Sequence, residues 1–323
     1  MIMRWAPEQE RSKFITFTYM GGTVGTLVTY PLCGLLIRHY DWESVYYFGG
    51  AFGLGWLAMW AVLVTDDPKN HWFISGEERK HIVETRTQTL GKIGVCTPPY
   101  LEILLTPTVW IAMFCDFANS IGSYLIIIEG PNFIKNILHQ DIKSNGVLSA
   151  VPHLASMVYG IIFGILADMI MSKGWLTKPN VRKLMHGIGF GLPAITAALL
   201  GYTTANWVLC ITVLSLGFGF RSAQYCGHYS LIYDIAPKFS GTVYGMVNMC
   251  GNTAGFITPI LTSAVTGADP TDPNGWRHLF WIAGGLLTVG FFVFILFANF
   301  EVAKFEYRDD DECRPSKTKK ADV

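Results

Sequence analysis

Arg221 lies in the middle of a long apolar stretch and is the first residue whose type and position suggest chemistry. An arginine at the centre of a membrane costs about 2.5–3.5 kcal/mol on insertion scales, so it needs a partner or a wet cavity. Gln224, Tyr225 and His228 follow three, four and seven residues later, which predicts one polar helical face. Because a guanidinium matches the geometry of carboxylate and phosphate, this face suits an organic anion. Two other interpretations stay open: a structural ion pair, or a side chain that reaches the membrane surface.

A second polar face is predicted in the apolar stretch 107–129, where Asp116 and Asn119 are three residues apart and Tyr124 lies further along. Asp116 is expected at a depth similar to that of Arg221, so we expect the two side chains to face each other. An anion that breaks such a pair would change the proton affinity of the carboxylate, and proton coupling requires such a change. A permanent salt bridge is the more common arrangement, and the sequence does not decide between the two.

Two more titratable residues are candidates for proton coupling. His153 lies well inside an apolar stretch, and histidine is the side chain that titrates between pH 5 and 8. A hydrogen-bonded histidine that only packs is the alternative interpretation. Glu129 ends the stretch that holds Asp116, and it either titrates or is an exposed carboxylate at the membrane interface.

The composition excludes several other classes of protein. The 323 residues are 51% apolar and 15% charged, whereas an average soluble domain is about 25% charged. Lys+Arg and Asp+Glu both number 24, so there is no basic excess to bind nucleic acid. Seven Cys without a CxxC pair indicate neither a zinc site nor a disulfide framework. The sequence has no HExxH, GxSxG or GxGxxG motif, so we expect no enzyme, no metal and no cofactor.

Apolar stretches of about 20 residues indicate an all-α, polytopic membrane protein, because a helix of that length crosses the hydrocarbon core. We predict eight transmembrane helices, which cover residues 14–37, 44–65, 107–129, 145–170, 184–204, 206–233, 240–266 and 278–300. The polar stretch 66–106 separates the second from the third. It is expected to hold a short amphipathic surface helix, since Ser75 and Glu78 fit a capping box.

The distribution of basic residues predicts the orientation. Of the 24 Lys and Arg residues, 19 fall on the side of both termini and of the stretch 66–106, and only four fall on the other side. Basic loops stay on the cytoplasmic side of a membrane. We therefore expect both termini in the cytoplasm, and no signal peptide, because the first apolar stretch is a full-length span. The sequence does not distinguish the plasma membrane from a vesicle or lysosome membrane.

The first two apolar stretches resemble the last two. Ala6-Pro7 precedes the first and Ala236-Pro237 precedes the seventh, and each is followed by a small-residue run and a proline. A repeat of six helices is the build of major facilitator transporters, which predicts twelve helices, of which this chain holds helices 5–12. The predicted regions are the end of an N-terminal six-helix bundle (1–65), a cytoplasmic central loop with an amphipathic helix (66–106), a C-terminal six-helix bundle (107–304) and a cytoplasmic tail (305–323).

Glycine pairs at GxxxG spacing predict close contacts between helices, and Gly251 with Gly255 is one of them. Asn248 and Asn252 share a helical face in the same stretch. They either line the transport path or form hydrogen bonds between helices.

Five motifs in chain order resemble the anion:cation symporter family of the major facilitator superfamily, which includes sialin, the vesicular glutamate transporters and the sodium/phosphate cotransporters. The motifs are Trp5-Ala6-Pro7-Glu8-Gln9-Glu10-Arg11-Ser12, Ser75-Gly76-Glu77-Glu78-Arg79, Leu148-Ser149-Ala150-Val151-Pro152-His153-Leu154, Ala167-Asp168 with Val181-Arg182-Lys183, and Asp234-Ile235-Ala236-Pro237. The resemblance covers residues 4 to 304. It implies the major facilitator fold, with helices 7 and 10 lining a central cavity.

The resemblance assigns roles to particular residues as expectations. In the superfamily, the loop between helices 8 and 9 carries a charge relay that holds the inner gate shut, and Asp168, Arg182 and Lys183 match it. The residues expected to bind substrate are Asn119, Tyr124, Arg221, Gln224 and His228. The residues expected to couple protons are Asp116, Glu129 and His153.

Two departures from the family pattern limit what the resemblance implies. Vesicular glutamate transporters have an arginine in helix 7 where this chain has Asn119, so Arg221 is a candidate functional substitute. The family usually has Asn-His-Leu before the helix 10 aspartate, where this chain has Leu231-Ile232-Tyr233. Glutamate is therefore not carried over as the substrate.

The sequence as a whole predicts a secondary active transporter. Its expected partners are the lipid bilayer and a small organic or inorganic anion, which moves with a proton or sodium ion by alternating access. The alternative is an N-terminally truncated, non-transporting membrane protein that acts as a binding or regulatory partner, because half of a central cavity would lack its lining.

Overall fold

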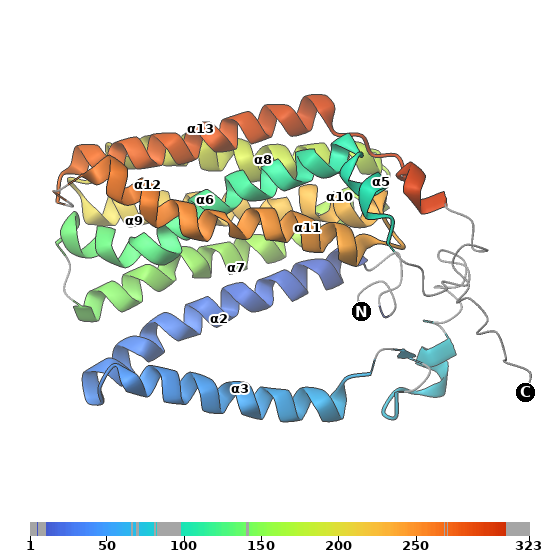
Figure 1. Ribbon diagram of the computed structural model, residues 1–323, viewed down its shortest axis with the longest axis horizontal. Coiled ribbons are helices and arrows are strands. Elements are labelled where there is room, and N and C mark those ends of the chain that lie inside the picture. The colour runs from blue at the N-terminus through green and yellow to red at the C-terminus, as the bar shows by residue number, and fades with distance from the viewer. Residues whose placement is uncertain are drawn as a thin grey trace, which may run out of the picture.

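The structure is a computed structural model that describes residues 5, 11–65, 67–68, 71–80, 82, 98–139, 142–267, 269 and 271–307. Throughout these ranges the regular structure is helical (Figure 1). The longer helices are α2 Arg11–His39, α3 Glu43–Leu63, α6 Pro107–Asn136, α7 Ile142–Ser172, α8 Lys178–Leu200, α9 Trp207–Arg221, α11 Ser240–Asn252, α12 Ala254–Thr266 and α13 Pro273–Phe297. The shorter ones are α5 Tyr100–Leu104, η3 Ser222–Tyr225, α10 His228–Ile235 and η4 Lys304–Tyr307.

Each predicted apolar stretch coincides with one helix or with consecutive helices. Six segments of the described chain are long and apolar enough to cross a membrane: α3, α6, α7 from Val147, α8, the segment from α9 to α10, and α13. The chain is thus an all-α protein with membrane-crossing helices, as predicted. The count of eight stays a prediction, because α2 is not among the six and because α11 and α12 have 13 residues each.

The helices from α6 to α13 form one elongated body (Figure 1). Within it, α13 packs on α6 and α8, α7 packs on α9, and both α11 and α12 pack on α6. Helix α2 runs along α7, and α3 lies on the far side of α2 with no buried side chain. The polar stretch 66–106 is described only in part, where the Ser75 hydroxyl accepts a hydrogen bond from the Glu78 amide at 3.2 Å, as a helix N-cap does.

The stretch 206–233 is not the single helix that the sequence predicts. Helix α9 ends at Arg221, a 3₁₀ turn follows, and α10 begins only after Gly227, whose backbone is not helical. Helix α8 packs closely against the chain at this break. A Cβ on Gly189 would lie 2.7 Å from the Gln224 amide nitrogen, and one on Gly227 would lie 2.9 Å from the His186 nitrogen. The prediction of one regular polar face after Arg221 is therefore wrong, because the α-helix is interrupted there.

Residues just beyond the last long helix fold back onto the body. The Ala303 amide donates to the Ile235 carbonyl oxygen at 2.9 Å, and Phe305 is buried. The Glu306 carboxylate accepts hydrogen bonds from the amides of Lys238 (2.9 Å) and Phe239 (3.1 Å), at the start of α11. Burial raises the pKa of Glu306, and the two amide donors lower it. Residues 305–307 of the predicted tail are thus folded, and the rest of that tail lies outside the described residues.

Replacing Glu306 by alanine is expected to destabilise the protein by about 2 kcal/mol, since the half-buried amide of Lys238 and the buried amide of Phe239 lose their acceptor. Thermal unfolding of the purified protein in detergent measures the change. Glu301→Ala is the matched control, because Glu301 is exposed five residues earlier. Equal melting temperatures for the two variants would show that the Glu306 hydrogen bonds contribute nothing to the stability of the fold.

Candidate functional site

Arg221 lies inside the helical body, at the point where α9 gives way to the 3₁₀ turn. Its Nε donates a hydrogen bond to the Asn119 side-chain oxygen at 2.6 Å, which ties α9 to α6. The guanidinium carbon lies 5.4 Å from the ring centroid of Phe218, one turn earlier on α9. These contacts fix the cation in place. Its two terminal nitrogens make no hydrogen bond or ion pair with any described residue, so they are available to an anion.

Asp116 and Arg221 belong to one polar cluster, as expected, but they are not a direct ion pair. The Tyr229 hydroxyl donates to Asp116 Oδ1 at 2.5 Å, and the Asn119 amide approaches the same hydroxyl at 3.5 Å. Asp116 is 4% exposed and is attracted electrostatically by Arg221. Asn119 and Tyr229 thus stand between the two charges, so the permanent salt bridge considered from the sequence is not formed. Tyr229 was not among the predicted site residues.

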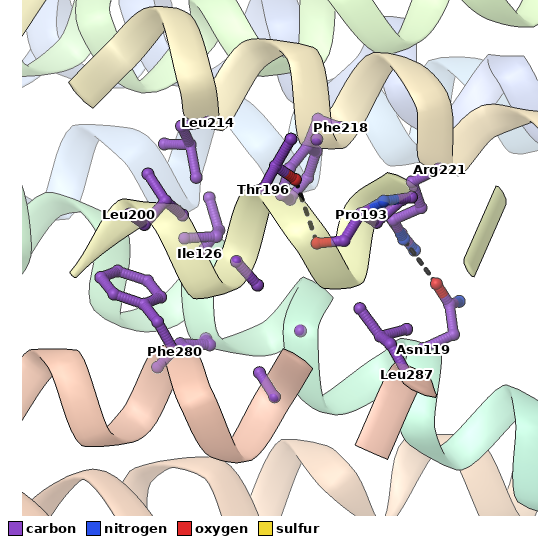
Figure 2. A pocket seen from close by; sticks show the side chains of 15 residues that line it. Asn119, Ile126, Pro193, Thr196, Leu200, Leu214, Phe218, Arg221, Phe280 and Leu287 are labelled. Carbon is purple, nitrogen blue, oxygen red and sulfur yellow. Dashed lines mark hydrogen bonds between the residues drawn. The ribbon is translucent and has the colours of Figure 1, made fainter. Parts of the chain in front are cut away.

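A pocket in the body opens beside this cluster (Figure 2). It lies between α6, α8, α9 and α13. Arg221 and Asn119 line one end, Leu200, Leu214 and Phe280 line the other, and the Thr196 hydroxyl between them donates to the Pro193 carbonyl oxygen at 3.0 Å. The remaining lining residues are Gly122, Leu125, Ile126, Ala197, Gly217, Phe218, Ala283 and Leu287. The pocket is therefore almost wholly apolar, with its single cation at one end.

Three other predicted binding residues lie outside the lining of this pocket. Gln224 and His228 are completely buried against α8. The Tyr124 hydroxyl donates to the Asn252 side-chain oxygen at 2.6 Å, and the Asn252 amide donates to the Asn248 carbonyl oxygen at 2.9 Å. Tyr124 thus belongs to a hydrogen-bond network between α6 and α11, one of the two alternatives stated for the asparagines.

Of the other predicted coupling residues, His153 lies closer to the cluster than Glu129 does. The His153 ring packs between Tyr30 of α2 (5.9 Å between centroids) and Phe218 of α9 (5.4 Å), and its charge would interact with Arg221. Its Nε2 is buried without a partner among the described groups. Glu129 accepts a hydrogen bond from the Asn132 amide at 3.0 Å, a local contact within α6.

Arg182, one of the residues expected at the gate, forms an ion pair at the start of α8 that the sequence did not predict. Arg182 Nε donates to Asp234 Oδ2 at 2.9 Å, and Lys178 Nζ lies 2.9 Å from Asp234 Oδ1. Arg182 also donates to the Cys226 carbonyl oxygen at 3.0 Å. The carboxylate that Arg182 binds is therefore on α10, not Asp168 on α7, and the Lys183 ammonium lies 5.7 Å from the centroid of the Phe300 ring. Asp234 was quoted for its motif but was not predicted to have a role.

The Asp116 carboxylate lies directly against Gly251 of α11, where a Cβ would overlap Asp116 Oδ2. We expect Gly251→Ala to destabilise the protein by about 2 kcal/mol, because overpacking moves helices apart. Gly245→Ala is the control on the same helix, since no atom lies within 4 Å of a Cβ there. It should be neutral or slightly stabilising. Thermal unfolding of both variants measures the change in stability. An unchanged stability of Gly251→Ala would contradict the close contact between Gly251 and Asp116.

Comparison with known proteins identifies the family of the chain. Residues 1–259 match the family model of the Major Facilitator Superfamily. The chain is 33% identical to the uncharacterized transporter slc-17.2 of Caenorhabditis elegans over 96% of its own length and 64% of the relative's. It is 30% identical to human vesicular glutamate transporter 2 over 97% of its own length and 54% of the relative's. The chain thus spans between half and two thirds of the length of these relatives.

A solved structure shows the same fold. The proton:xylose symporter XylE, bound to 6-bromo-6-deoxy-D-glucose, matches 94% of this chain and 68% of its own with a TM-score of 0.65 and 16% identity. The family model, the relatives and this fold confirm the resemblance drawn from the five motifs. The chain is an integral membrane protein that belongs to the major facilitator superfamily, and it is similar to the vesicular glutamate transporters within that superfamily.

Proposed function

We propose that this chain forms the anion-binding part of a secondary active transporter, which moves a small anion together with a proton. The observation that carries the proposal is the Arg221 guanidinium, which is held by Asn119 through Nε and leaves its two terminal nitrogens unoccupied. A planar fork of donors in a membrane interior favours a carboxylate or phosphate group over a neutral ligand. Relatives named as vesicular glutamate transporters support an anionic substrate.

The coupling ion is proposed to be a proton taken up by Asp116. This buried carboxylate accepts one hydrogen bond, from Tyr229, and lies near the cation without contacting it. An anion bound to Arg221 would offset the guanidinium charge and so favour protonation of Asp116. Binding of the anion and of the proton would then support each other. The name of the structural neighbour, a proton:xylose symporter, is consistent with this choice over sodium.

The test is uptake of radiolabelled anions into liposomes. The 323-residue chain and any longer native product that contains it are reconstituted side by side, with imposed pH or sodium gradients. The panel comprises phosphate, glutamate, sialic acid, urate and a nucleotide. We expect one of the two proteins to accumulate at least one anion under the pH gradient.

Each outcome separates the proposal from its alternative. Accumulation under a sodium gradient alone would contradict the proton as coupling ion, but the proposal that the protein transports an anion would stand. Saturable binding of an anion to both proteins without flux would favour the non-transporting binding partner. Neither binding nor flux for any anion on the panel would contradict the proposed site.

A further inference from the structure

The pocket beside Arg221 is built from two turns of each of four helices (Figure 2). On every helix the first and last lining residues are seven positions apart: Asn119 and Ile126 on α6, Pro193 and Leu200 on α8, Leu214 and Arg221 on α9, and Phe280 and Leu287 on α13. Seven residues of an α-helix rise about 10 Å. The pocket is therefore elongated over that length, and its empty volume, open mouth included, is about 490 Å³.

Charge is confined to one end of this pocket. Arg221 is the only charged residue in the lining, and the Asn119 side-chain oxygen beside it already accepts a hydrogen bond from Arg221 Nε. The other polar side chain of the lining, Thr196, donates its hydroxyl hydrogen to the Pro193 carbonyl oxygen. A second charged group on a bound anion would thus meet no free side-chain donor in the rest of the lining, and burying a charge without a partner is unfavourable.

The opposite end of the pocket offers only hydrocarbon. Leu200, Leu214 and Phe280 line it, and each is at most 4% exposed. Apolar ligand surface that leaves water against such side chains gains free energy in proportion to its area. An extended chain advances about 1.2 Å per bond, so a pocket about 10 Å long accommodates a tail of at most about seven carbons.

We propose that this pocket recognises monocarboxylates whose apolar tail has about five to seven carbons. The carboxylate lies on the two terminal nitrogens of Arg221 as a bidentate pair, and the tail extends toward Phe280. The inference rests on the proposed function, because it names the class of anion that Arg221 binds. Polar anions such as phosphate and glutamate reach Arg221 with a charged group but cannot use the apolar end, so they bind more weakly.

The test measures the affinity of the protein for carboxylates of graded length, in lipid nanodiscs and with the signal of empty nanodiscs subtracted. The probes are acetate, butyrate, hexanoate, octanoate and decanoate. We expect affinity to rise about fourfold for each added methylene up to hexanoate. It should stop rising beyond octanoate, because the tail then reaches the far wall. Phosphate and glutamate are expected to bind about tenfold more weakly than hexanoate, or weaker still.

Adipate is the matched polar probe, since it has the six carbons of hexanoate and a second carboxylate at the far end. That charge would lie against Leu200, Leu214 and Phe280, so adipate should also bind about tenfold more weakly than hexanoate, or weaker still. Equal affinities for hexanoate and adipate, or an affinity that does not depend on tail length, would overturn the proposal.

Gly122 allows the pocket to be filled without a clash. It lies on the same face of α6 as Asn119 and Ile126, and no atom lies within 4 Å of a Cβ built there. Gly122→Leu is expected to lower the affinity for hexanoate about tenfold more than the affinity for acetate, because the leucine takes the space of the tail. The control is Gly285→Leu, since Gly285 is exposed, equally open and outside the lining. It should leave both affinities within twofold.

Shortening the far wall should have the opposite effect. Leu214→Ala removes apolar atoms at that end, so the longest tail that still gains affinity should lengthen by about two carbons. If this variant does not fold, Leu200→Ala tests the same wall from α8. An unchanged preference for tail length in a folded variant, or equal losses for acetate and hexanoate in Gly122→Leu, would place the tail outside this pocket and overturn the proposal.

The failure of this inference differs from failure of the proposed function. If the unmodified protein binds phosphate or glutamate at least as tightly as hexanoate, Arg221 still binds an anion, but the apolar end of the pocket plays no part. If it binds none of the probes, the proposed anion site itself is contradicted.

Discussion

Replacing Arg221 by glutamine is expected to weaken anion binding by about 10- to 100-fold. A hydrogen bond to a charged group contributes about 1.5–3 kcal/mol, and each 1.4 kcal/mol is a factor of ten in affinity. Glutamine retains a donor toward Asn119 but removes the only cation in the pocket lining. Titration of a radiolabelled anion that the unmodified protein binds gives the affinity directly. An unchanged dissociation constant would exclude Arg221 from the binding site.

Two further substitutions locate the origin of that loss. Arg221→Lys keeps the charge but not the planar fork, so an intermediate loss is expected if the anion is held by two parallel hydrogen bonds. Arg277→Gln is the matched control, because Arg277 lies near the start of α13, where its Nε donates to the Gly201 carbonyl oxygen. It should leave anion affinity within twofold, provided that the variant melts like the unmodified protein.

Replacing Asp234 by asparagine is expected to destabilise the protein by about 3 kcal/mol. Arg182 is 4% exposed and has this carboxylate as its one ionic partner among the described residues. Removing one member of a buried pair leaves an uncompensated charge, which costs more than the pair contributes when intact. Denaturation in detergent measures the loss.

Lys178 provides a matched comparison, because it binds the other oxygen of the same carboxylate from an exposed position. Lys178→Met should cost at most about 1 kcal/mol, as exposed ion pairs do. A double variant, Asp234→Asn with Arg182→Met, should recover part of the lost stability, since no buried charge remains. If Asp234→Asn and Lys178→Met cost the same, the Arg182 pair is not the one that holds α8 to α10.

The positions of the helices were predictable, because about 20 apolar residues in a row leave few alternatives. The interior position of Arg221 followed from the same reasoning, and so did its place in one cluster with Asp116. The course of the backbone after Arg221 could not be predicted from the sequence. The argument that residues share one helical face holds only for an unbroken helix, and the 3₁₀ turn Ser222–Tyr225 interrupts this one. Tyr229 therefore reaches Asp116, while Gln224 turns toward α8.

The ion pair between Arg182 and Asp234 was not predicted, for a different reason. The family resemblance places Asp168 with Arg182, whereas the structure pairs Arg182 with Asp234, and the gating role stays a prediction. The packing of α10 against α8 decides whether Asp168 or Asp234 reaches Arg182. The spacing of residues within one helix gives no information about that packing.

The most direct test of proton-coupled anion transport is the movement of protons that the anion itself causes. Liposomes containing the protein and an internal pH indicator are placed in a pH-clamped medium without an imposed pH gradient, and the transported anion is added outside. The account predicts acidification of the interior that depends on the anion, saturates with its concentration and is lost in Asp116→Asn. Anion accumulation without acidification, or acidification that persists in Asp116→Asn, would contradict it.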